Sequence, residues 1–150
     1  MYISLTKFEI AEAQLHRAIS LYIEGFDLIS VVTLAGAADE ILGKMNRAAA
    51  RKAALDDQVE RLCDMYEAAF KEKPNPQAFV ELRNKARNAF KHFGSDELTK
   101  IDLEREACGI VSRAIENYKK LKPSFNKQFW EFEKEMLRRH REEQRRICGE

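Results

Sequence analysis

The chain has few of the residues that would cross-link a small secreted domain. It holds three cysteines in 150 residues, Cys63, Cys108 and Cys148, and no two of them form a Cys-x-x-Cys pair. An odd number of widely spaced cysteines argues against a disulfide framework and against a structural zinc site. We therefore expect no bound metal and no cofactor, and a protein of the reducing cytoplasm.

Glycine and proline are also scarce, with six and three residues respectively. Few positions therefore interrupt regular structure. An apolar content of 45% and a charged content of 34% are typical of an ordered, mostly helical protein. A chain of this length can bury one sizeable core, so we expect a single domain.

Long apolar runs are absent, and so is an excess of charge of one sign. No stretch approaches the roughly 20 apolar residues that span a bilayer. Residues 1–7 lack the basic segment and apolar run of an export signal, so we expect no membrane association. A formal net charge of +1 gives no overall attraction to nucleic acid, so RNA binding would require positive charge concentrated locally.

Apolar residues recur with the 3.6-residue period of helices, and strand-like alternation is almost absent. Thr6 is placed to start a first helix and Gly25 to end it. The pattern predicts an all-α fold, a single-domain helical bundle of about five to six helices with an extended C-terminal helix. Further helices are expected over about 27–47, 56–71, 76–94, 103–121 and from 124 onward. We expect the bundle at 1–122, and at 123–150 a C-terminal helix and charged tail, either in the same domain or as an extension that packs in a dimer.

Two of these helices have faces that suggest how they pack. The second is nearly continuous in apolar residues over 28–38, so it should be the most buried helix. Its Ala35-Gly36-Ala37-Ala38 run would let a neighbouring helix approach closely. The first helix is expected to bury the following side chains: Phe8, Leu15, Ile19, Tyr22 and Phe26.

The helix expected from Pro76 onward carries the most informative polar residues. Its apolar stripe consists of Phe79, Leu82, Ala86, Ala89, Phe90 and Phe93. At about 100° per residue, Asn84 and Asn88 point away from this stripe. Arg83 and Arg87 follow one border of the stripe, and His92 lies at the other. Arginine and histidine are the usual side chains for holding a phosphate and moving a proton near neutral pH.

The segment Arg87-Asn88-Ala89-Phe90-Lys91-His92 resembles the signature of the HEPN superfamily of small helical bundles. That signature is an arginine, four to six residues and a histidine, often with a polar residue directly after the arginine. The order of helices is similar over roughly residues 5–121. The resemblance implies a HEPN-like fold and, as in many members, a metal-independent ribonuclease that acts as a toxin or defence effector. Other members are non-catalytic interaction modules or partners of a small nucleotidyltransferase that acts as antitoxin.

The resemblance assigns the catalytic roles to Arg87, Asn88 and His92. His92 would act as general base or acid while an RNA 2′-hydroxyl attacks the adjacent phosphorus and leaves a cyclic phosphate. Arg87 would hold the phosphoryl oxygens, and Asn88 would orient the histidine or the phosphate. Arg87 and His92 are about 140° apart on an ideal helix, so we expect a homodimer in which two copies share one cleft. The candidate RNA contacts beside the motif are Lys91, Arg83 and Asn84.

Plainer interpretations of the same residues stay open. The polar face of the fourth helix fits an ordinary solvated surface, and the chain then fits a non-catalytic helical module for dimerisation or partner binding. The arginines within 138–146 fit either a solvated helix or an RNA contact. Asp39 and Glu40 are expected to supply a buried partner for Arg83 or Arg87. Glu12 and His16 lie one turn apart, but too few further ligands follow for a di-metal bundle.

Overall fold

The fold is entirely helical over the residues that the structure, a computed structural model, describes: 2–91 and 100–148. No strand is present in these two ranges. The prediction of an all-α bundle with a long C-terminal helix is confirmed. The helices are α1 (Lys7–Glu24), α2 (Leu28–Ala48), α3 (Ala54–Phe70), α4 (Pro76–Lys91), α5 (Leu103–Leu121) and α6 (Lys127–Cys148). None of these helices is long and apolar enough to cross a bilayer.

Local side chains define the ends of α1 as the sequence predicts. The Thr6 hydroxyl accepts the Glu9 backbone N–H at 3.2 Å, and the Glu9 carboxylate accepts the Thr6 N–H at 2.7 Å. These two bonds form a capping box, which satisfies backbone donors at the helix start. Gly25 ends the helix in the left-handed region, with φ of 77°. Phe26 follows this turn and is 71% exposed, so its predicted place in the core is wrong.

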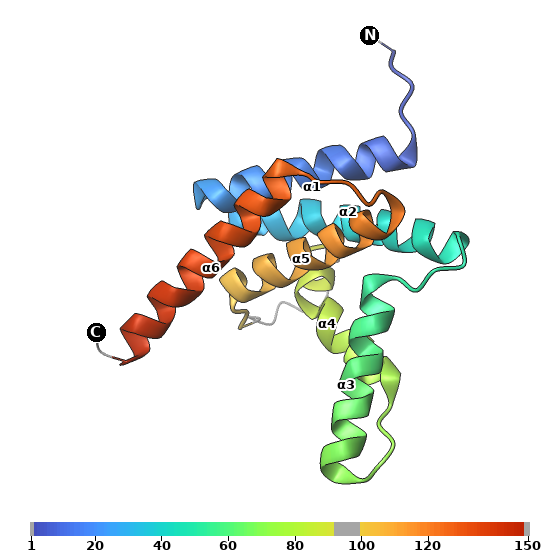
Figure 1. Cartoon of the computed structure of the whole chain (residues 1–150), viewed down its shortest axis with the longest axis vertical. Coiled ribbons are helices and arrows are strands. Elements are labelled where there is room, and N and C mark those ends of the chain that lie inside the picture. Colours follow the sequence, from blue (N-terminus) through green and yellow to red (C-terminus); the bar gives the residue numbers. More distant parts are fainter. Residues whose placement is uncertain (1, 92–99, 149–150) are drawn as a thin grey trace.

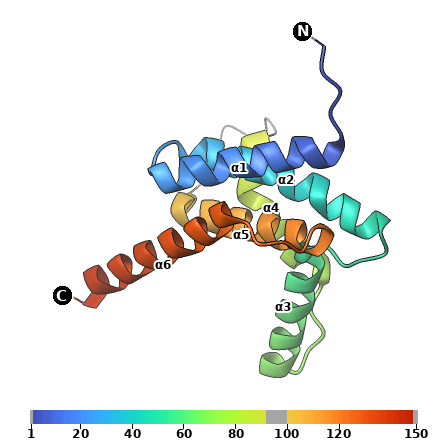
Figure 2. The ribbon, with the colours of Figure 1, turned by 45° about the horizontal axis from the view of Figure 1, so that its top comes forward.

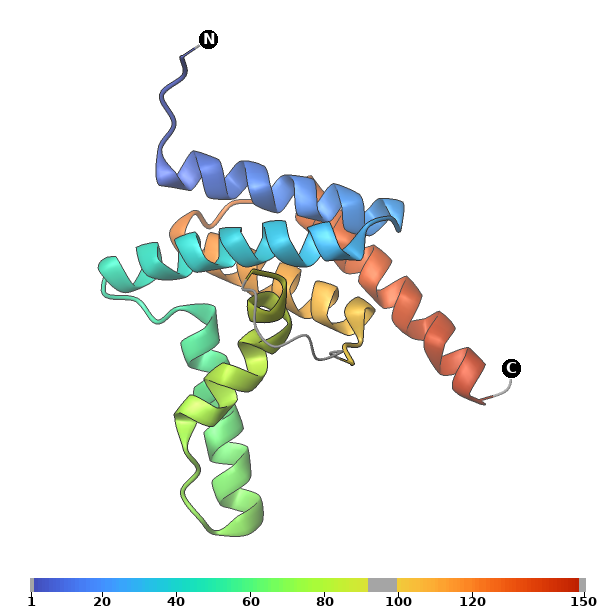
Figure 3. The same ribbon diagram turned by 180° about the vertical axis from the view of Figure 1, so that it is seen from behind.

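The core lies between α1, α2 and α5, which run side by side, and α6 crosses them near its first turns (Figures 1 and 3). The apolar run of α2 is buried as predicted, and Gly36 within it is buried too. α6 contributes Phe129 and Phe132, whose rings contact the rings of Tyr118 and Tyr22 with centroids 5.0 Å apart in each pair. The expected close approach at Gly36 involves α4, which packs against α2 at this position.

Helices α3 and α4 form a hairpin that projects away from the rest of the bundle (Figures 1 and 2). We call this pair the α3–α4 arm. The buried residues of α3 are Ala54 and Val59, both near its first turns. Farther out, the Tyr66 ring contacts Phe70 and Phe79 with centroids 4.6 and 6.2 Å away. The arm therefore has little core of its own, and its apolar side chains are largely exposed.

The second half of α6 extends beyond the bundle and remains helical to Cys148 (Figure 2). Arg139 ties its middle to the bundle, because its guanidinium lies 4.4 Å from the Tyr22 ring centre and bonds Glu104 at 2.9 Å. All residues of 140–148 are exposed. This exposure is compatible with both interpretations of its arginines, a solvated helix and an RNA contact.

Candidate functional site

The orientation of α4 differs from the one that the apolar pattern predicts. Asn84 was expected to point away from the core, yet it is 7% exposed. Leu82, expected in the core stripe, is 62% exposed, and Ala89 is exposed as well. The physical reason is a polar contact, because the Asn84 carboxamide oxygen accepts a bond from Arg113 Nη2 at 2.9 Å. A buried guanidinium thus determines which face of α4 turns inward.

Arg113 is the centre of a buried polar network that the sequence analysis missed. The side chain is 1% exposed, and its Nε donates to Asp39 Oδ2 at 2.9 Å. Asp39 was expected to pair with Arg83 or Arg87, and this expectation is wrong. One turn later on α5, Asn117 Nδ2 donates to the other Asp39 oxygen at 2.9 Å. The available signal was the polar pair Arg113 and Asn117, spaced four residues apart beside the apolar stripe of α5.

The network continues to the start of the α3–α4 arm. Asn46 donates to the Asn117 carbonyl at 2.9 Å and to the Leu42 carbonyl at 3.0 Å. The Asn117 side chain accepts the Ala54 backbone N–H at 2.8 Å, and this residue opens α3. Buried polar groups with their hydrogen bonds made fix a unique arrangement of the elements they join. The network therefore sets where both helices of the arm leave the bundle.

Arg87 lies on the same side of α4 as this network, over α2. Its aliphatic stem covers Gly36 so closely that a Cβ atom there would be 2.8 Å from Arg87 Cγ and 2.9 Å from Cδ. The Nε atom is buried and has no hydrogen-bond partner within residues 2–91 and 100–148. Nη2 makes a long bond of 3.4 Å to the side chain of Asn88. Among the described residues Arg87 forms no ion pair with a carboxylate.

The other predicted site residues are divided between several places. Asn88 is exposed beside Arg87. Arg83 turns toward α3 and donates to the Gln58 side chain at 3.1 Å. The side chain of Lys91 and the whole of His92 lie outside the described residues. The structure therefore brings Arg87 and Asn88 together, places Asn84 in the core, and leaves Arg83 one turn away in a different contact.

A groove of about 1090 Å³ lies between α5 and the outer part of α6, and Arg83 reaches its edge. Its wall carries basic and acidic side chains side by side, such as Arg105 and Glu143. Cys108 also lines it, but burial raises the pKa of this thiol. A thiol with a raised pKa is a poor nucleophile because the thiolate is the reactive form. The groove has neither a dominant charge nor an activated nucleophile.

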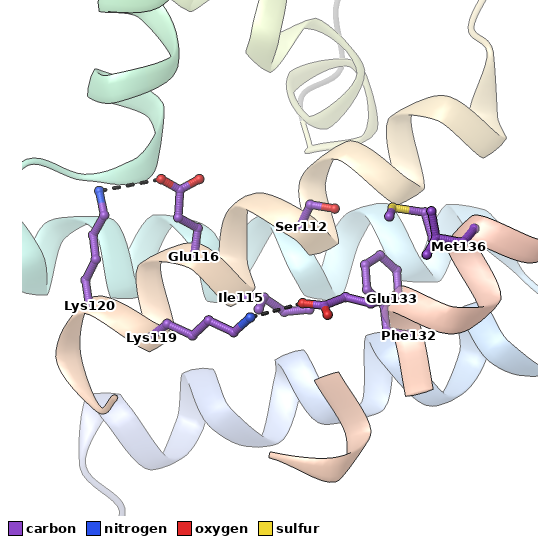
Figure 4. Close-up of a pocket in the computed structure, with 9 residues that line it drawn as sticks. Ser112, Ile115, Glu116, Lys119, Lys120, Phe132, Glu133 and Met136 are labelled. Atoms are coloured by element: carbon purple, nitrogen blue, oxygen red, sulfur yellow. Dashed lines mark hydrogen bonds and ion pairs between the residues drawn. The ribbon is translucent and has the colours of Figure 1, made fainter. Parts of the chain in front are cut away.

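A second hollow, of about 570 Å³, lies between α5 and α6 nearer the core (Figure 4). Ile115, Phe132 and Met136 form apolar parts of its lining. Lys119 points toward Glu133 and pairs with it at 3.0 Å. Lys120 pairs with Glu116 at 3.7 Å. Because both lysines already have carboxylate partners, this hollow does not present a free catalytic cation.

Glu12 and His16 do not converge on a common point. Glu12 accepts a hydrogen bond from the Tyr118 hydroxyl, which lowers the pKa of the carboxyl group, and pairs with Lys122 at 3.5 Å. The His16 ring nitrogen lies 3.3 Å from the Asn126 amide. In the part of the chain that the structure describes, no group of three or more histidine, cysteine or acidic side chains is arranged to hold a metal ion.

The exposed end of α4 is the best candidate site that these observations leave. It combines a guanidinium that has no ion pair in the described part of the chain and an exposed carboxamide, both on a helix that buried polar bonds hold in place. The residues that follow in the motif begin directly after the last described turn of α4. Comparisons of the chain with protein-family models, with curated proteins and with solved structures found no match.

Proposed function

We propose that the chain is a metal-independent endoribonuclease of HEPN type that uses Arg87, Asn88 and His92. The observation that carries this proposal is the state of Arg87. A guanidinium is always charged, and here one buried nitrogen has no acceptor and the group forms no ion pair among the described residues. Buried donors are nearly always satisfied, and a phosphate oxygen is the strongest partner for a guanidinium. An RNA phosphate would supply what Arg87 lacks.

The proposed chemistry is attack of an RNA 2′-hydroxyl on the adjacent phosphorus. His92 takes the proton from the 2′-oxygen or gives one to the leaving 5′-oxygen, and the products are a 2′,3′-cyclic phosphate and a 5′-hydroxyl. Arg87 stabilises the negative charge that develops on the phosphoryl oxygens. Asn88, which already contacts Arg87, orients the phosphate or the histidine. This sequence of proton transfers needs no metal ion.

The position of Arg87 supports this role because it is fixed from two sides. Gly36 gives its stem a close seat on α2. One turn earlier, Asn84 is bonded to Arg113 and so fixes the rotation of α4. Catalytic groups work best when packing and hydrogen bonds hold them before the substrate arrives. Asn84 is thus a positioning residue in this proposal, while Arg83 and Lys91 keep their proposed contacts with RNA.

The active form in this proposal is a homodimer. Two copies around a twofold axis place two sets of the motif at one cleft, which overcomes the angular separation of Arg87 and His92 on one helix. The exposed apolar side chains of the α3–α4 arm, among them Met65, Phe70 and Leu82, provide a surface for such pairing. If the chain acts as a toxin, it would also have an antitoxin as a partner. The resemblance implies that this antitoxin would be a small nucleotidyltransferase.

The same arm favours the second candidate function, a non-catalytic interaction module. Met65, Phe70 and Leu82 are 68%, 63% and 62% exposed, although large apolar residues are normally buried. A helical partner or a second copy would cover them. In that case Arg87 and its neighbours contribute to an interface and carry out no reaction.

Cleavage of mixed RNA in the presence of a chelator separates the two functions. The nuclease proposal predicts that the purified chain cuts RNA with EDTA present and that His92→Ala abolishes cutting. Arg61→Ala is the matched control, because Arg61 is exposed on α3 and makes no ion pair with another described residue. It should cut as the wild type does, and all three proteins should unfold at similar temperatures. Equal cutting by the wild type and His92→Ala, or none by either, would leave the interaction module.

A further inference from the structure

One side of α6 faces solvent and contributes no side chain to the core. Phe129 and Phe132 turn inward and are 2% and 1% exposed, whereas Trp130 is 49% exposed. At about 100° per residue, a set of exposed side chains falls within an arc of about 80° around Trp130. We call this set the α6 strip: Lys127, Trp130, Lys134, Leu137, Arg141 and Arg145.

Two acidic residues of α6 are paired with cations outside the strip. Glu135 bonds Arg138 at 2.6 Å and Arg139 at 2.7 Å. Glu142 bonds Arg138 as well. Inside the strip, the Lys127 ammonium pairs with Glu131 at 3.5 Å, and this is the one ion pair that a strip cation makes among the described residues.

The remaining cations of the strip keep their charge available. Arg141 and Arg145 have no carboxylate partner in the described ranges. Lys134 Nζ lies 4.2 Å from the centre of the Trp130 ring, a cation–π contact that leaves the ammonium on the surface. Because the chain as a whole is nearly neutral, RNA binding requires positive charge that is concentrated locally. The strip provides such a concentration on one exposed side of α6.

A shallow hollow of about 610 Å³ runs beside these cations. Ile23 of α1 and Leu137 give it apolar surface, and its charged lining includes Arg141 and Arg145. Glu131, Glu135 and Glu142 line it as well, and each of these carboxylates has an arginine or lysine partner on α6. From Trp130 to Arg145 the helix rises about 22 Å, which accommodates several nucleotides. A single strand of nucleic acid presents flat bases along a line of phosphates. The strip offers a matching surface, because it combines an exposed aromatic ring, apolar surface and a row of cations.

We propose that the α6 strip binds single-stranded RNA. Lys134, Arg141 and Arg145 contact successive phosphates, and one base stacks on Trp130. This inference rests on the proposed function, since it gives the ribonuclease a place to hold its substrate outside the cleavage site. Binding and cleavage are nevertheless different measurements, so either one can fail without the other.

A membrane surface is a poorer match for the same residues. Helices that lie on bilayers insert a continuous apolar face below a basic one. The apolar face of α6, with Phe129 and Phe132, is already packed in the core. Trp130 and Leu137 are the apolar members that the strip retains. Two apolar residues are too few for such a membrane-facing surface, whereas a single aromatic ring is enough to stack one base. A flexible strand of RNA is therefore the better partner for the strip.

The test is fluorescence anisotropy with a labelled 12-nucleotide RNA whose 2′-hydroxyls are methylated, so that binding is read without cleavage. The full chain is compared with Arg141→Gln/Arg145→Gln and with Trp130→Ala. Loss of two phosphate contacts should reduce the slope of log affinity against log salt by about 1.4. Loss of stacking should weaken binding by at least about fivefold. The matched control is Lys7→Gln/Arg61→Gln, which removes the same charge from exposed positions outside α6.

The outcomes distinguish this inference from the proposed function. Strip variants that bind with wild-type affinity and salt slope, or a wild type that binds no RNA, would overturn the strip even if RNA is cut. Strip-dependent binding with no cleavage by the wild type would overturn the nuclease and leave the strip in place. Binding to phosphatidylserine vesicles in place of RNA would also contradict the inference. Circular dichroism must show equal helix content in all variants, as expected for substitutions at exposed positions.

Discussion

Asn84 shows at the scale of one residue why α4 has its orientation. Its side chain accepts a bond from Arg113, which is itself bonded to Asp39. A buried guanidinium without acceptors would cost several kcal/mol, more than one exposed leucine costs. Leu82 therefore lies in solvent while a polar side chain faces the core.

Replacement of Asn84 and Asn88 by alanine should have very different effects. Asn84→Ala removes an acceptor from buried Arg113, so the free energy of unfolding should fall by roughly 1–3 kcal/mol. Asn88→Ala changes an exposed position and should stay within about 0.5 kcal/mol of the wild type. Urea unfolding followed by circular dichroism measures both. Equal stability of the two variants would contradict the orientation of α4 described above.

Glu135 should make stability depend on pH in the acid range. A hydrogen bond from Arg138, then one from Arg139, lowers the pKa of this carboxyl group from 4.5 to about 2. A lowered pKa means that the ionised form stabilises the fold, so the contribution is complete above the ordinary pKa and is lost as pH falls toward about 2. Urea unfolding at about pH 6 and about pH 3 should show a smaller loss for Glu135→Gln than for the wild type. An identical loss in both proteins would rule out this coupling.

Sequence reasoning identified the charged residues but not their pairing. Asp39 was correctly expected to have a buried cationic partner, and the partner turned out to be Arg113 on α5. The sequence analysis did not single out Arg113, which lies beside the apolar residues of α5. Pairing across helices depends on their rotation, which the period of one helix does not define.

At the scale of elements, the contact between α4 and α2 decides where Arg87 lies. Gly36 lets the Arg87 stem approach closer than any side chain at this position would permit. The sequence predicted a close approach here from the small residues around Gly36. It did not predict which residue would approach, because the apolar stripe of α4 suggested a different face.

Gly36→Ala and Gly43→Ala form a matched pair on α2. At Gly43 a new Cβ would meet Ala53 Cβ at 3.5 Å, an ordinary contact, so alanine should stabilise the helix by about 0.5–1 kcal/mol. At Gly36 it would overlap the Arg87 stem, and the strain should cost about 1–3 kcal/mol. Thermal unfolding should therefore rank Gly43→Ala above Gly36→Ala. The reverse order would mean that Arg87 does not rest on Gly36.

Boundaries of elements were easier to predict than rotations. The start of α1 at Thr6 and its end at Gly25 follow from capping chemistry within a few residues of sequence. The same local chemistry also places the break at Gly25 before Phe26, although the apolar spacing suggested that Phe26 continues the buried face. Local signals define where a helix ends, while tertiary contacts define which side is covered.

At the scale of the whole molecule, the α3–α4 arm is the surface that we propose as the interface of the homodimer. It projects from the bundle with exposed apolar residues on both helices (Figure 3). The chain would leave this surface in water as a monomer, whereas a symmetric pair would cover it. The network around Asn117 holds the base of the arm in place. In the proposed dimer, it would therefore fix the position of α4 relative to the interface.

Sedimentation equilibrium should find a dimer for the wild type and a monomer for Met65→Glu/Leu82→Glu. Two charges in an apolar interface would each be desolvated without a partner, which disfavours association strongly. Ile29→Glu is the control, because Ile29 is 55% exposed on α2 and lies outside the arm. A double variant that remains dimeric would assign the interface to another surface. A monomeric wild type would contradict the proposed homodimer.

Cleavage of a short labelled RNA in EDTA tests the role of Arg87 most directly. We expect that the wild type leaves a 2′,3′-cyclic phosphate, that a 2′-deoxy substitution at the cut nucleotide blocks the reaction, and that Arg87→Ala slows it by at least about 100-fold. Arg87→Lys should restore only part of the rate, because lysine cannot make paired bonds to a phosphate. Cleavage at the wild-type rate by Arg87→Ala, with the same cyclic product, would contradict the account.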